Sequence, residues 1–245
     1  MDAVLEIREM SKAFGGLQAV RNFDLQVHKG DLVGIIGPNG AGKTTVFNMV
    51  TGFIRPDSGE VWFNGENITR LKPYQIVNRG LCRTFQLVDL FKEMTALENV
   101  MIPCFSHRIR RQGSKEGKPW KVAMKFLEEV GLGKRFNEQA KNLAFGELRL
   151  LDIARAMATQ PDILLLDEPF SGLDAEDADI LSSAIRQMHG KGQTMMIIEH
   201  RLRDLLKLVE RVVAIVFGEK MAEGTPQEIM SNPKVINAYL GERRD

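Results

Sequence analysis

The sequence is poor in cysteine and lacks a long apolar run. Its two cysteines, Cys82 and Cys104, form neither a CxxC motif nor a pair with metal-binding spacing, so a disulfide framework is not expected. Free thiols in a reducing compartment are the simpler prediction. The longest apolar stretches, such as residues 212–217, are far shorter than the roughly 20 residues that a membrane-spanning helix requires. Residues 1–10 carry acids and no apolar h-region, so a signal peptide is not expected either.

An excess of charge of either sign is also missing. Lysine and arginine number 33 and aspartate and glutamate 32, which gives a formal net charge of +1. A nearly neutral chain is not built as a bulk nucleic-acid binder. The hydrophobic share of 44% and the charged share of 27% are ordinary for a folded domain, so disorder is excluded as a description of the whole chain.

Short apolar runs alternate with amphipathic stretches along the chain. Strands are predicted at residues 4–8, 19–27, 32–36, 61–63, 81–84, 163–166, 194–198 and 212–217. A helix is predicted to follow residue 45 and end at Gly52. Helical periodicity dominates residues 95–158 and returns at 176–188. This alternation predicts an α/β fold with a largely parallel sheet, into which a helical segment is inserted.

The segment 107–121 is strongly basic. Its cations are Arg108, Arg110, Arg111, Lys115, Lys118 and Lys121, against the single acid Glu116. A solvated loop between helices is the ordinary interpretation of such a run. Contact with an anionic membrane surface or with a partner is the alternative.

Residues 37–45 spell GPNGAGKTT and fit the motif GxxxxGK[ST] between a predicted strand and a predicted helix. The glycines let backbone N–H groups approach a phosphate, and the helix N-terminus favours the anion. Lys43 supplies a cation for the β- and γ-phosphates, and Thr44 supplies a hydroxyl ligand for Mg²⁺. A chance glycine-rich turn is disfavoured by the flanking elements. The predicted phosphate-binding residues are Gly37, Pro38, Asn39, Gly40, Ala41, Gly42, Lys43, Thr44 and Thr45.

A second polar site follows the apolar run at residues 163–166. This predicted strand delivers Asp167 to the carboxyl edge of the sheet, where ligands bind in such folds. Asp167 is expected to hold Mg²⁺, directly or through water. Glu168 would point the other way in a strand, and it is the candidate general base for an attacking water. A surface acid beside Pro169 is the alternative for Glu168.

Six elements occur in a fixed order: GPNGAGKTT (37–45), RTFQ (83–86), LAFGE (143–147), ILLLDEP (163–169), SGLD (171–174) and IIEH (197–200). In this order and spacing they resemble the ATP-binding cassette (ABC) ATPases, and the resemblance covers essentially the whole chain. It implies an α/β fold: a P-loop ATPase core with a mostly parallel sheet, an antiparallel β subdomain and an inserted α-helical subdomain. The corresponding segments are 1–86 and 159–245 for the core and 87–158 for the helical subdomain.

The same resemblance implies roles for single residues and the cofactors ATP and Mg²⁺. Phe14 matches an aromatic residue that lies against adenine, with a core phenylalanine as the alternative. Gln86 matches the Q-loop glutamine, which contacts Mg²⁺ or the attacking water and leads into the helical subdomain. His200 matches the switch histidine. The catalytic assignments are Glu168, His200, Gln86 and Lys43, and the metal assignments are Thr44, Gln86 and Asp167.

The element LAFGE departs from the family's signature pattern LSGGQ. Ala144 replaces the serine, and Phe145 replaces the first glycine. The missing hydroxyl removes one hydrogen bond to a γ-phosphate, worth about 1.5–3 kcal/mol. A helix that begins near Gly146 still favours an anion, so ATP-driven closure is expected to be altered rather than lost. Gly146 and the D-loop residue Asp174 are the remaining predicted contacts with nucleotide.

One chain contains one phosphate loop and one signature, which in this family face different nucleotides. The resemblance therefore implies a head-to-tail pair, either a homodimer or a heterodimer with a second ATPase subunit. It also implies transmembrane permease subunits, an indirect link to a solute-binding protein, and no nucleic acid. The expected location is peripheral, at the cytoplasmic face of the inner or plasma membrane. The permease is expected to contact residues 87–110, near Leu90, Phe91 and Met94.

Finer details resemble one branch of the family. FGGLQAV (14–20), IIEHRL (197–202) and the tail NPKVINAYLGE (232–242) are similar to the ATPase subunit of branched-chain amino acid importers. ATPases of urea or amide uptake and of lipopolysaccharide export share much of this pattern and remain alternatives. The tail is expected to be either a surface extension or a helix packed on the core.

Two further classes are disfavoured by missing features. A soluble, non-transport ABC ATPase usually carries two cassettes, zinc modules or long coiled coils, and the sequence has none of these. A GTPase would need a guanine-reading NKxD motif, which is also missing, and a P-loop kinase gives the signature and His200 no role.

Overall fold

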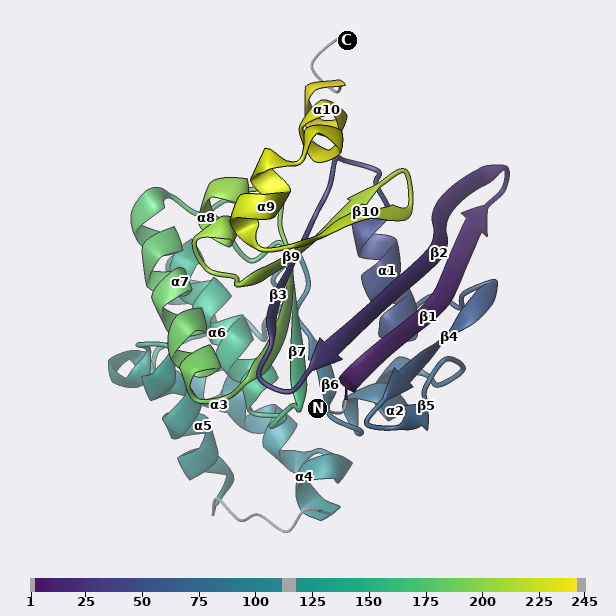
Figure 1. Ribbon diagram of the computed structural model, residues 1–245. Coiled ribbons are helices and arrows are strands. Elements are labelled where there is room, and N and C mark those ends of the chain that lie inside the picture. The colour runs from purple at the N-terminus through teal and green to yellow at the C-terminus, as the bar shows by residue number, and fades with distance from the viewer. Residues whose placement is uncertain (1–2, 112–117, 242–245) are drawn as a thin grey trace. The chain divides into compact units, whose positions relative to one another are not determined.

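The computed structural model describes residues 3–111 and 118–241 (Figure 1). The chain divides into two compact units. Unit 1 comprises Met1–Ile76 and Thr194–Asp245, and unit 2 comprises Val77–Gln193. The predicted helical segment, residues 87–158, lies within the bounds of unit 2. The finer boundaries at 86/87 and 158/159 stay a prediction.

Unit 1 contains an antiparallel sheet with the strand order β2-β1-β4-β5. Strands β1 (Ala3–Phe14) and β2 (Leu17–His28) form a long pair, drawn in purple in Figure 1. Strands β4 (Ser58–Phe63) and β5 (Glu66–Asn67) complete it. On β2, Phe23, Leu25 and Val27 are buried while the residues between them are exposed, which is the period of two expected of a half-covered sheet. The antiparallel part of the predicted fold is thereby confirmed.

Four strands of unit 1 are arranged in the order β10-β9-β3-β8. Strands β3 (Leu32–Ile36), β8 (Thr194–Ile198) and β9 (Arg211–Val216) are parallel, and β10 (Glu219–Gly224) pairs antiparallel with β9. β3 and β8 are buried at every residue, as the continuous apolar runs predicted. β10 was not predicted, because its sequence EKMAEG is polar and has no apolar alternation.

The helices of unit 1 are short. They are α1 (Lys43–Val50), α2 (Pro73–Val77, which ends at the unit boundary), α8 (Leu202–Leu206), α9 (Pro226–Ser231) and α10 (Pro233–Gly241). The helix predicted to end at Gly52 ends two residues earlier. In the tail, Val235 is buried, and α10 packs against α9, β9 and β10. Of the two expectations for the tail, packing is therefore the correct one for its described residues; Glu242 lies outside them.

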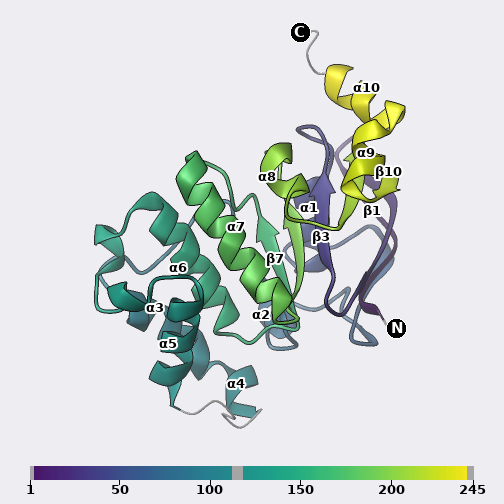
Figure 2. The same ribbon diagram turned by 60° about the vertical axis from the view of Figure 1, so that its left-hand side comes forward.

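Unit 2 contains the parallel pair β6 (Leu81–Arg83) and β7 (Ile163–Asp167) together with a group of helices. The helices are α3 (Ala96–Met101), α4 (His107–Arg111), α5 (Pro119–Glu129), α6 (Phe145–Met157), α7 (Ala175–Gly190) and the 3₁₀ turns η1 (Ile102–Phe105), η2 (Gly133–Arg135) and η3 (Ala140–Asn142). Helix α6 packs against α3, α5 and α7 (Figure 2). Its predicted apolar face, which includes Leu150, Leu151 and Ala154, is buried.

Part of the basic segment has an internal role. The Arg108 guanidinium donates to the carbonyl oxygen of Arg79 at 2.6 Å, to that of Gln160 at 3.1 Å and to Asp162 Oδ1 at 3.1 Å. Arg108 therefore joins α4 to the loops around β6 and β7, and is not a solvated loop residue. Lys118 and Lys121 are exposed. Lys115 and Glu116 lie outside the described residues, so the interpretation of the rest of the segment stays open.

The sequence predicted neither a disulfide framework nor a membrane-spanning helix. Cys82 and Cys104 are both buried and neither takes part in a disulfide, and burial raises the pKa of the Cys82 thiol. Within residues 3–111 and 118–241, no helix combines the length and the apolar character that crossing a bilayer requires.

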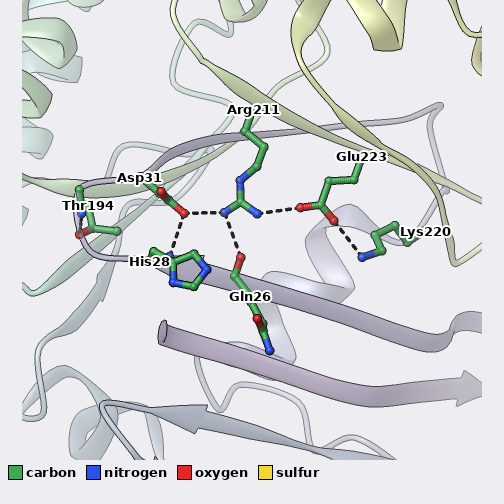
Figure 3. A network of polar contacts seen from close by, with 8 residues as sticks. Gln26, His28, Asp31, Thr194, Arg211, Lys220 and Glu223 are labelled. Atoms are coloured by element: carbon green, nitrogen blue, oxygen red, sulfur yellow. Dashed lines mark hydrogen bonds and ion pairs between the residues drawn. The ribbon is translucent and has the colours of Figure 1, made fainter. Parts of the chain in front are cut away.

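Arg211, at the start of β9, is the centre of a polar network in unit 1 (Figure 3). Its Nη2 donates to Asp31 Oδ2 at 2.6 Å and to the carbonyl oxygen of Gln26 at 2.9 Å. Its Nη1 donates to Glu223 Oε1 at 2.7 Å, and Lys220 donates to the other oxygen of Glu223 at 2.9 Å. One guanidinium thus ties β9 to the end of β2, to the start of β3 and to β10.

This network predicts a pH-dependent contribution to stability. Burial acts to raise the pKa of Glu223, but hydrogen bonds from Lys220 and Arg211 outweigh it, so the pKa is lowered. A depressed native pKa gives stability that is present above the unfolded value of about 4.3 and is lost as pH falls through the native value. Glu223→Gln should lower the free energy of unfolding at pH 7 by about 1 kcal/mol, allowing for screening of these partly exposed groups.

Urea unfolding at pH 7 and at successively lower pH values measures this difference, which should shrink below about pH 4. The matched control is Glu219→Gln, because Glu219 pairs with Arg21 while both side chains are more than half exposed. An equal loss at every pH would show that Glu223 acts through packing and not through its charge.

Candidate nucleotide site

The phosphate loop of unit 1 connects β3 to α1. Gly42 caps α1 with a φ of 101°, and a Cβ at this position would collide with the carbonyl oxygen of Ala19. Only glycine combines that backbone angle with that close approach. Helix α1 begins at the next residue, Lys43, so its first N–H groups face the loop as the motif predicted.

Lys43 is buried, and its ammonium lies over the loop. Nζ donates to the carbonyl oxygen of Gly37 at 2.6 Å and to that of Pro38 at 2.8 Å. A cation is therefore fixed beside the backbone N–H groups at the start of α1, where an anion is favoured. The other members of the predicted set include the exposed Asn39, Gly40 and Thr44, the half-buried Pro38 and Thr45, and the buried Ala41.

Phe14 lies at the end of β1 and is not a core residue. It is 46% exposed, and the Lys12 ammonium is 5.6 Å from the centroid of its ring. The core alternative is excluded by this exposure. A solvent-accessible aromatic ring can stack on a base, and the contact with adenine stays a prediction.

In unit 2, β7 ends at Asp167, whose side chain is almost fully buried. Its Oδ2 forms an ion pair with Arg83 Nη2 at 2.5 Å, and the Arg83 guanidinium also lies 4.9 Å from the centroid of the Phe85 ring. The pair compensates the carboxylate for the water it has lost. Arg83 belongs to the RTFQ element, but no role was predicted for it from the sequence. A role as the partner of Asp167 could have been predicted, because Arg83 is a cation on a predicted strand that runs parallel to the strand ending in Asp167.

Glu168 lies just outside β7, so the premise that strand alternation sets the direction of its side chain was wrong. Its φ is +49°, in the left-handed region that side chains other than glycine rarely adopt. Such strain is concentrated at functional sites. Glu168 Oε2 accepts a hydrogen bond from Gln86 Nε2 at 2.7 Å. The structure thus brings together two residues that the sequence placed in catalysis.

The signature helix α6 begins at Phe145, one residue earlier than expected. Ala144 occupies the cap position and has no side-chain acceptor, while Glu147 Oε2 accepts from the Ala144 N–H at 2.9 Å. Gly146 is buried against the carboxylate of Asp177. Asp174 caps α7, because its Oδ1 accepts from the Asp177 N–H at 2.9 Å. This capping role was not predicted, although an aspartate before a helix is a common cap. The nucleotide contacts of Gly146 and Asp174 stay predictions.

His200 follows β8 and is held by a residue that the sequence analysis did not single out. Glu199 is fully buried, and its Oε1 accepts from the N–H groups of His200 at 2.8 Å and of Arg201 at 3.0 Å. His200 Nδ1 lies 3.4 Å from the same oxygen, while about half of the imidazole is exposed. Glu199 therefore fixes the backbone that presents the His200 ring.

The residues predicted to hold Mg²⁺ carry oxygen donors of a kind that this ion prefers, and the metal assignment stays a prediction. Within the described residues no group of three or more histidine, cysteine, aspartate and glutamate side chains is suited to a metal ion. Thr44, Gln86 and Asp167 offer hydroxyl, amide and carboxylate oxygens, which are the hard donors that Mg²⁺ prefers. A single carboxylate suits an ion that is bound together with nucleotide phosphates and water, and not one held in an all-protein cage.

The role of Glu199 can be tested without nucleotide. Glu199→Ala should lower the free energy of unfolding by about 2 kcal/mol, because two backbone N–H groups lose their buried acceptor. Glu199→Gln retains an oxygen acceptor and should lose less than about half of that. Urea unfolding and hydrogen exchange of residues 199–202 measure both effects. Equal losses in the two variants would assign the effect to packing and not to the hydrogen bonds.

Two family models match the chain. The family model of the ABC transporter matches residues 20–171, and the model described as "Branched-chain amino acid ATP-binding cassette transporter" matches residues 219–245.

Among curated proteins, the chain is similar along its full length to two transport ATP-binding proteins. The high-affinity branched-chain amino acid transport ATP-binding protein BraF of Pseudomonas aeruginosa is 41% identical over 253 residues, and LivG of Escherichia coli K12, which carries the same description, is 39% identical over 250 residues. Each alignment covers 98% of both chains.

A solved structure extends the likeness to the fold. The ADP conformation of MJ1267, an ATP-binding cassette of an ABC transporter, has a TM-score of 0.88 at 33% identity and covers 98% of this chain and all of its own. The predicted cassette fold is thereby confirmed. With a family model over most of the chain and relatives at about 40% identity along its length, the chain belongs to the ABC transporter family, among the ATP-binding proteins of branched-chain amino acid transport.

Proposed function

We propose that this ABC ATPase uses ATP and Mg²⁺ to power the uptake of branched-chain amino acids. As an ABC ATPase it binds ATP and couples hydrolysis to transport. The solute assignment is carried by the full-length similarity to BraF and LivG, whose names specify branched-chain amino acid transport. The match of residues 219–245 to a model of the same branch supports it independently.

Nucleotide binding is assigned to unit 1. Phe14 provides an exposed ring for adenine, and residues 37–45 surround the phosphates. Lys43 is the cation, and the open N–H groups at the start of α1 are the donors. What supports this assignment is that the buried ammonium and the helix N-terminus meet at one loop, where both favour negative charge.

Hydrolysis is assigned to residues around β7. Glu168 is the general base that takes a proton from the attacking water, and the Gln86 amide orients its carboxylate through the 2.7 Å hydrogen bond. Thr44, Gln86 and Asp167 would hold Mg²⁺, whose chemistry when bound is to neutralise charge on the phosphates. His200 acts as the switch residue, and Glu199 fixes its backbone.

The protein is proposed to work as a pair. One chain has one phosphate loop and one signature, so a second copy or a related ATPase subunit would complete each nucleotide site. Gly146 and Asp174 would then contact nucleotide held by the partner. ATP binding drives this pair toward closure only if the closed state binds ATP more tightly than the open state does.

Contact with membrane-embedded permease subunits is assigned to the start of the helical segment. Phe91 is 52% exposed and Met94 is half-buried, whereas Leu90 is buried and is unavailable for direct contact. Glu98 is a cap residue of α3 and accepts from both the N–H and the hydroxyl of Thr95, which lower its pKa. Reversing the charge of Glu98 would damage the helix, so Phe91 is the cleaner probe of coupling.

Glu168→Gln should retain ATP binding and abolish turnover, because glutamine keeps the shape of the side chain and cannot take the proton. The loss expected for a removed general base is about 10²–10⁴-fold in kcat. Phosphate release measures turnover, and size-exclusion chromatography with ATP measures a trapped pair. Hydrolysis near the wild-type rate would mean that Glu168 is not the base.

Phe91→Ala should lower solute uptake about tenfold while basal ATP hydrolysis stays within about twofold, because truncation removes contact area from an exposed ring. The matched control is Phe136→Ala, another exposed phenylalanine of unit 2 that lies outside residues 87–110. Equal losses of uptake and hydrolysis would contradict a coupling role for Phe91.

The solute and partners are tested in source-cell membranes. Tagged Glu168→Gln protein with ATP should capture two multi-span permease chains from solubilised membranes, as read by mass spectrometry. Deleting the gene that encodes this chain should abolish uptake of labelled leucine and leave uptake of urea unchanged. Capture of soluble partners only, or loss of urea uptake alone, would contradict the proposed importer.

A further inference from the structure

Arg149, within the signature helix α6, bridges two loops of unit 2. The residue is buried, with 7% of its surface exposed. Nη1 donates to the carbonyl oxygen of Gln86 at 2.7 Å, and Nη2 donates to the carbonyl oxygen of Ser171 at 3.1 Å. Gln86 and Ser171 are far apart in sequence and belong to the RTFQ and SGLD elements. A single planar guanidinium thus holds the backbone of both.

Gln86 and Ser171, the two residues that Arg149 contacts, each donate a hydrogen bond to Glu168. Gln86 donates from its side chain to the carboxylate of Glu168 at 2.7 Å. The Ser171 N–H donates to the backbone carbonyl oxygen of Glu168 at 3.1 Å. Two short chains of hydrogen bonds therefore run from Arg149 to Glu168, one to its side chain and one to its main chain.

Phe145 covers the guanidinium from the first turn of the same helix. The centroid of its ring lies 5.2 Å from Arg149 Cζ, which is cation–π distance at the spacing i, i+4. The ring also rests on Gly172, where a Cβ would lie 3.0 Å from Phe145 Cε1. A larger residue at 172 would have to displace the ring. Phe145, which replaces a glycine of the family's signature pattern, therefore packs against Gly172, whose lack of a side chain leaves room for the ring.

We infer that Arg149 is a positioning residue: it fixes the place of Glu168 through the backbones of Gln86 and Ser171, with Phe145 holding the guanidinium in plane. The inference rests on the proposed function in one respect, the assignment of Glu168 as the base. Arginine suits this role because its planar fork satisfies two acceptors at once, whereas the lysine ammonium is a point charge on a flexible stem. The strained backbone of Glu168 requires such support from its surroundings.

The principal test compares two conservative substitutions in one helix. Arg149→Lys keeps the positive charge and removes the planar guanidinium whose two nitrogens donate to the two carbonyl oxygens. Arg155→Lys is the matched control, because Arg155 lies on the same helix and bonds to Asp152 of that helix at 2.8 Å. Hydrogen exchange read by mass spectrometry should be about fivefold faster in residues 84–90 and 169–174 of Arg149→Lys than of wild type. Arg155→Lys should match wild type in both segments.

Steady-state kinetics then separate positioning from general stability. Arg149→Lys should lower kcat for ATP hydrolysis about tenfold while the KM for ATP stays within about twofold, because an interaction that orients the base affects the chemical step more than binding. Phe145→Leu should lower kcat by a smaller factor. The double variant should lose less than the product of the two single effects, because the ring and the guanidinium act on each other.

Two results would overturn the inference. Faster exchange in only one of the two segments, or in neither, would mean that Arg149 does not hold both loops. Faster exchange in both with unchanged kcat would mean that the link is architectural and does not position the base. Exchange is measured without hydrolysis, so failure of the bridge is distinguishable from failure of the proposed function, which the Glu168→Gln variant tests separately.

Discussion

A strand that is buried along its whole length can place a polar group only at its end, because a charged side chain in its middle would lose its water without compensation. β3, β7 and β8 all obey this constraint. β3 leads directly into the phosphate loop, β7 ends at Asp167, and β8 is followed by Glu199 and His200. The apolar runs that make the core therefore also determine where polar chemistry can occur along the chain.

The same constraint explains why each buried charge has partners of its own. Asp167 has Arg83, Glu199 has two backbone N–H groups, and Lys43 has two loop carbonyls. Arg149 likewise donates to two carbonyls. These contacts replace solvation and at the same time fix the direction of each group. A side chain oriented in advance needs little reorganisation when it meets a ligand or a developing charge.

Sequence reasoning succeeded where residue type and spacing determine local structure. The glycine-rich loop between β3 and α1, the buried strands, the buried face of α6 and the place of Asp167 at the end of β7 were all predicted from pattern. Prediction from the sequence failed where the role of a residue depends on which other residues surround it in the folded protein. Arg83, Arg149 and Glu199 look like ordinary surface charges in the sequence, and only the fold shows that they are buried and paired.

The conformation of single residues was a further limit on prediction. The left-handed backbone at Glu168 removed the strand geometry on which the expected direction of its side chain depended. β10 was missed because a polar edge strand shows no apolar alternation, and it becomes a strand only by pairing with β9.

That edge strand has a consequence for the modularity of the protein. The stretch that matches the branch-specific family model begins at residue 219, where β10 begins, and it includes Glu223, a partner of Arg211. Through β10 and Glu223, this part of the chain is hydrogen-bonded into unit 1 and is not an appendage. A chimera that exchanged residues 219–245 for those of a relative would inherit a sheet edge and a counter-ion along with its tail. Compatibility at Arg211 therefore limits which ends of related proteins can be recombined with this core.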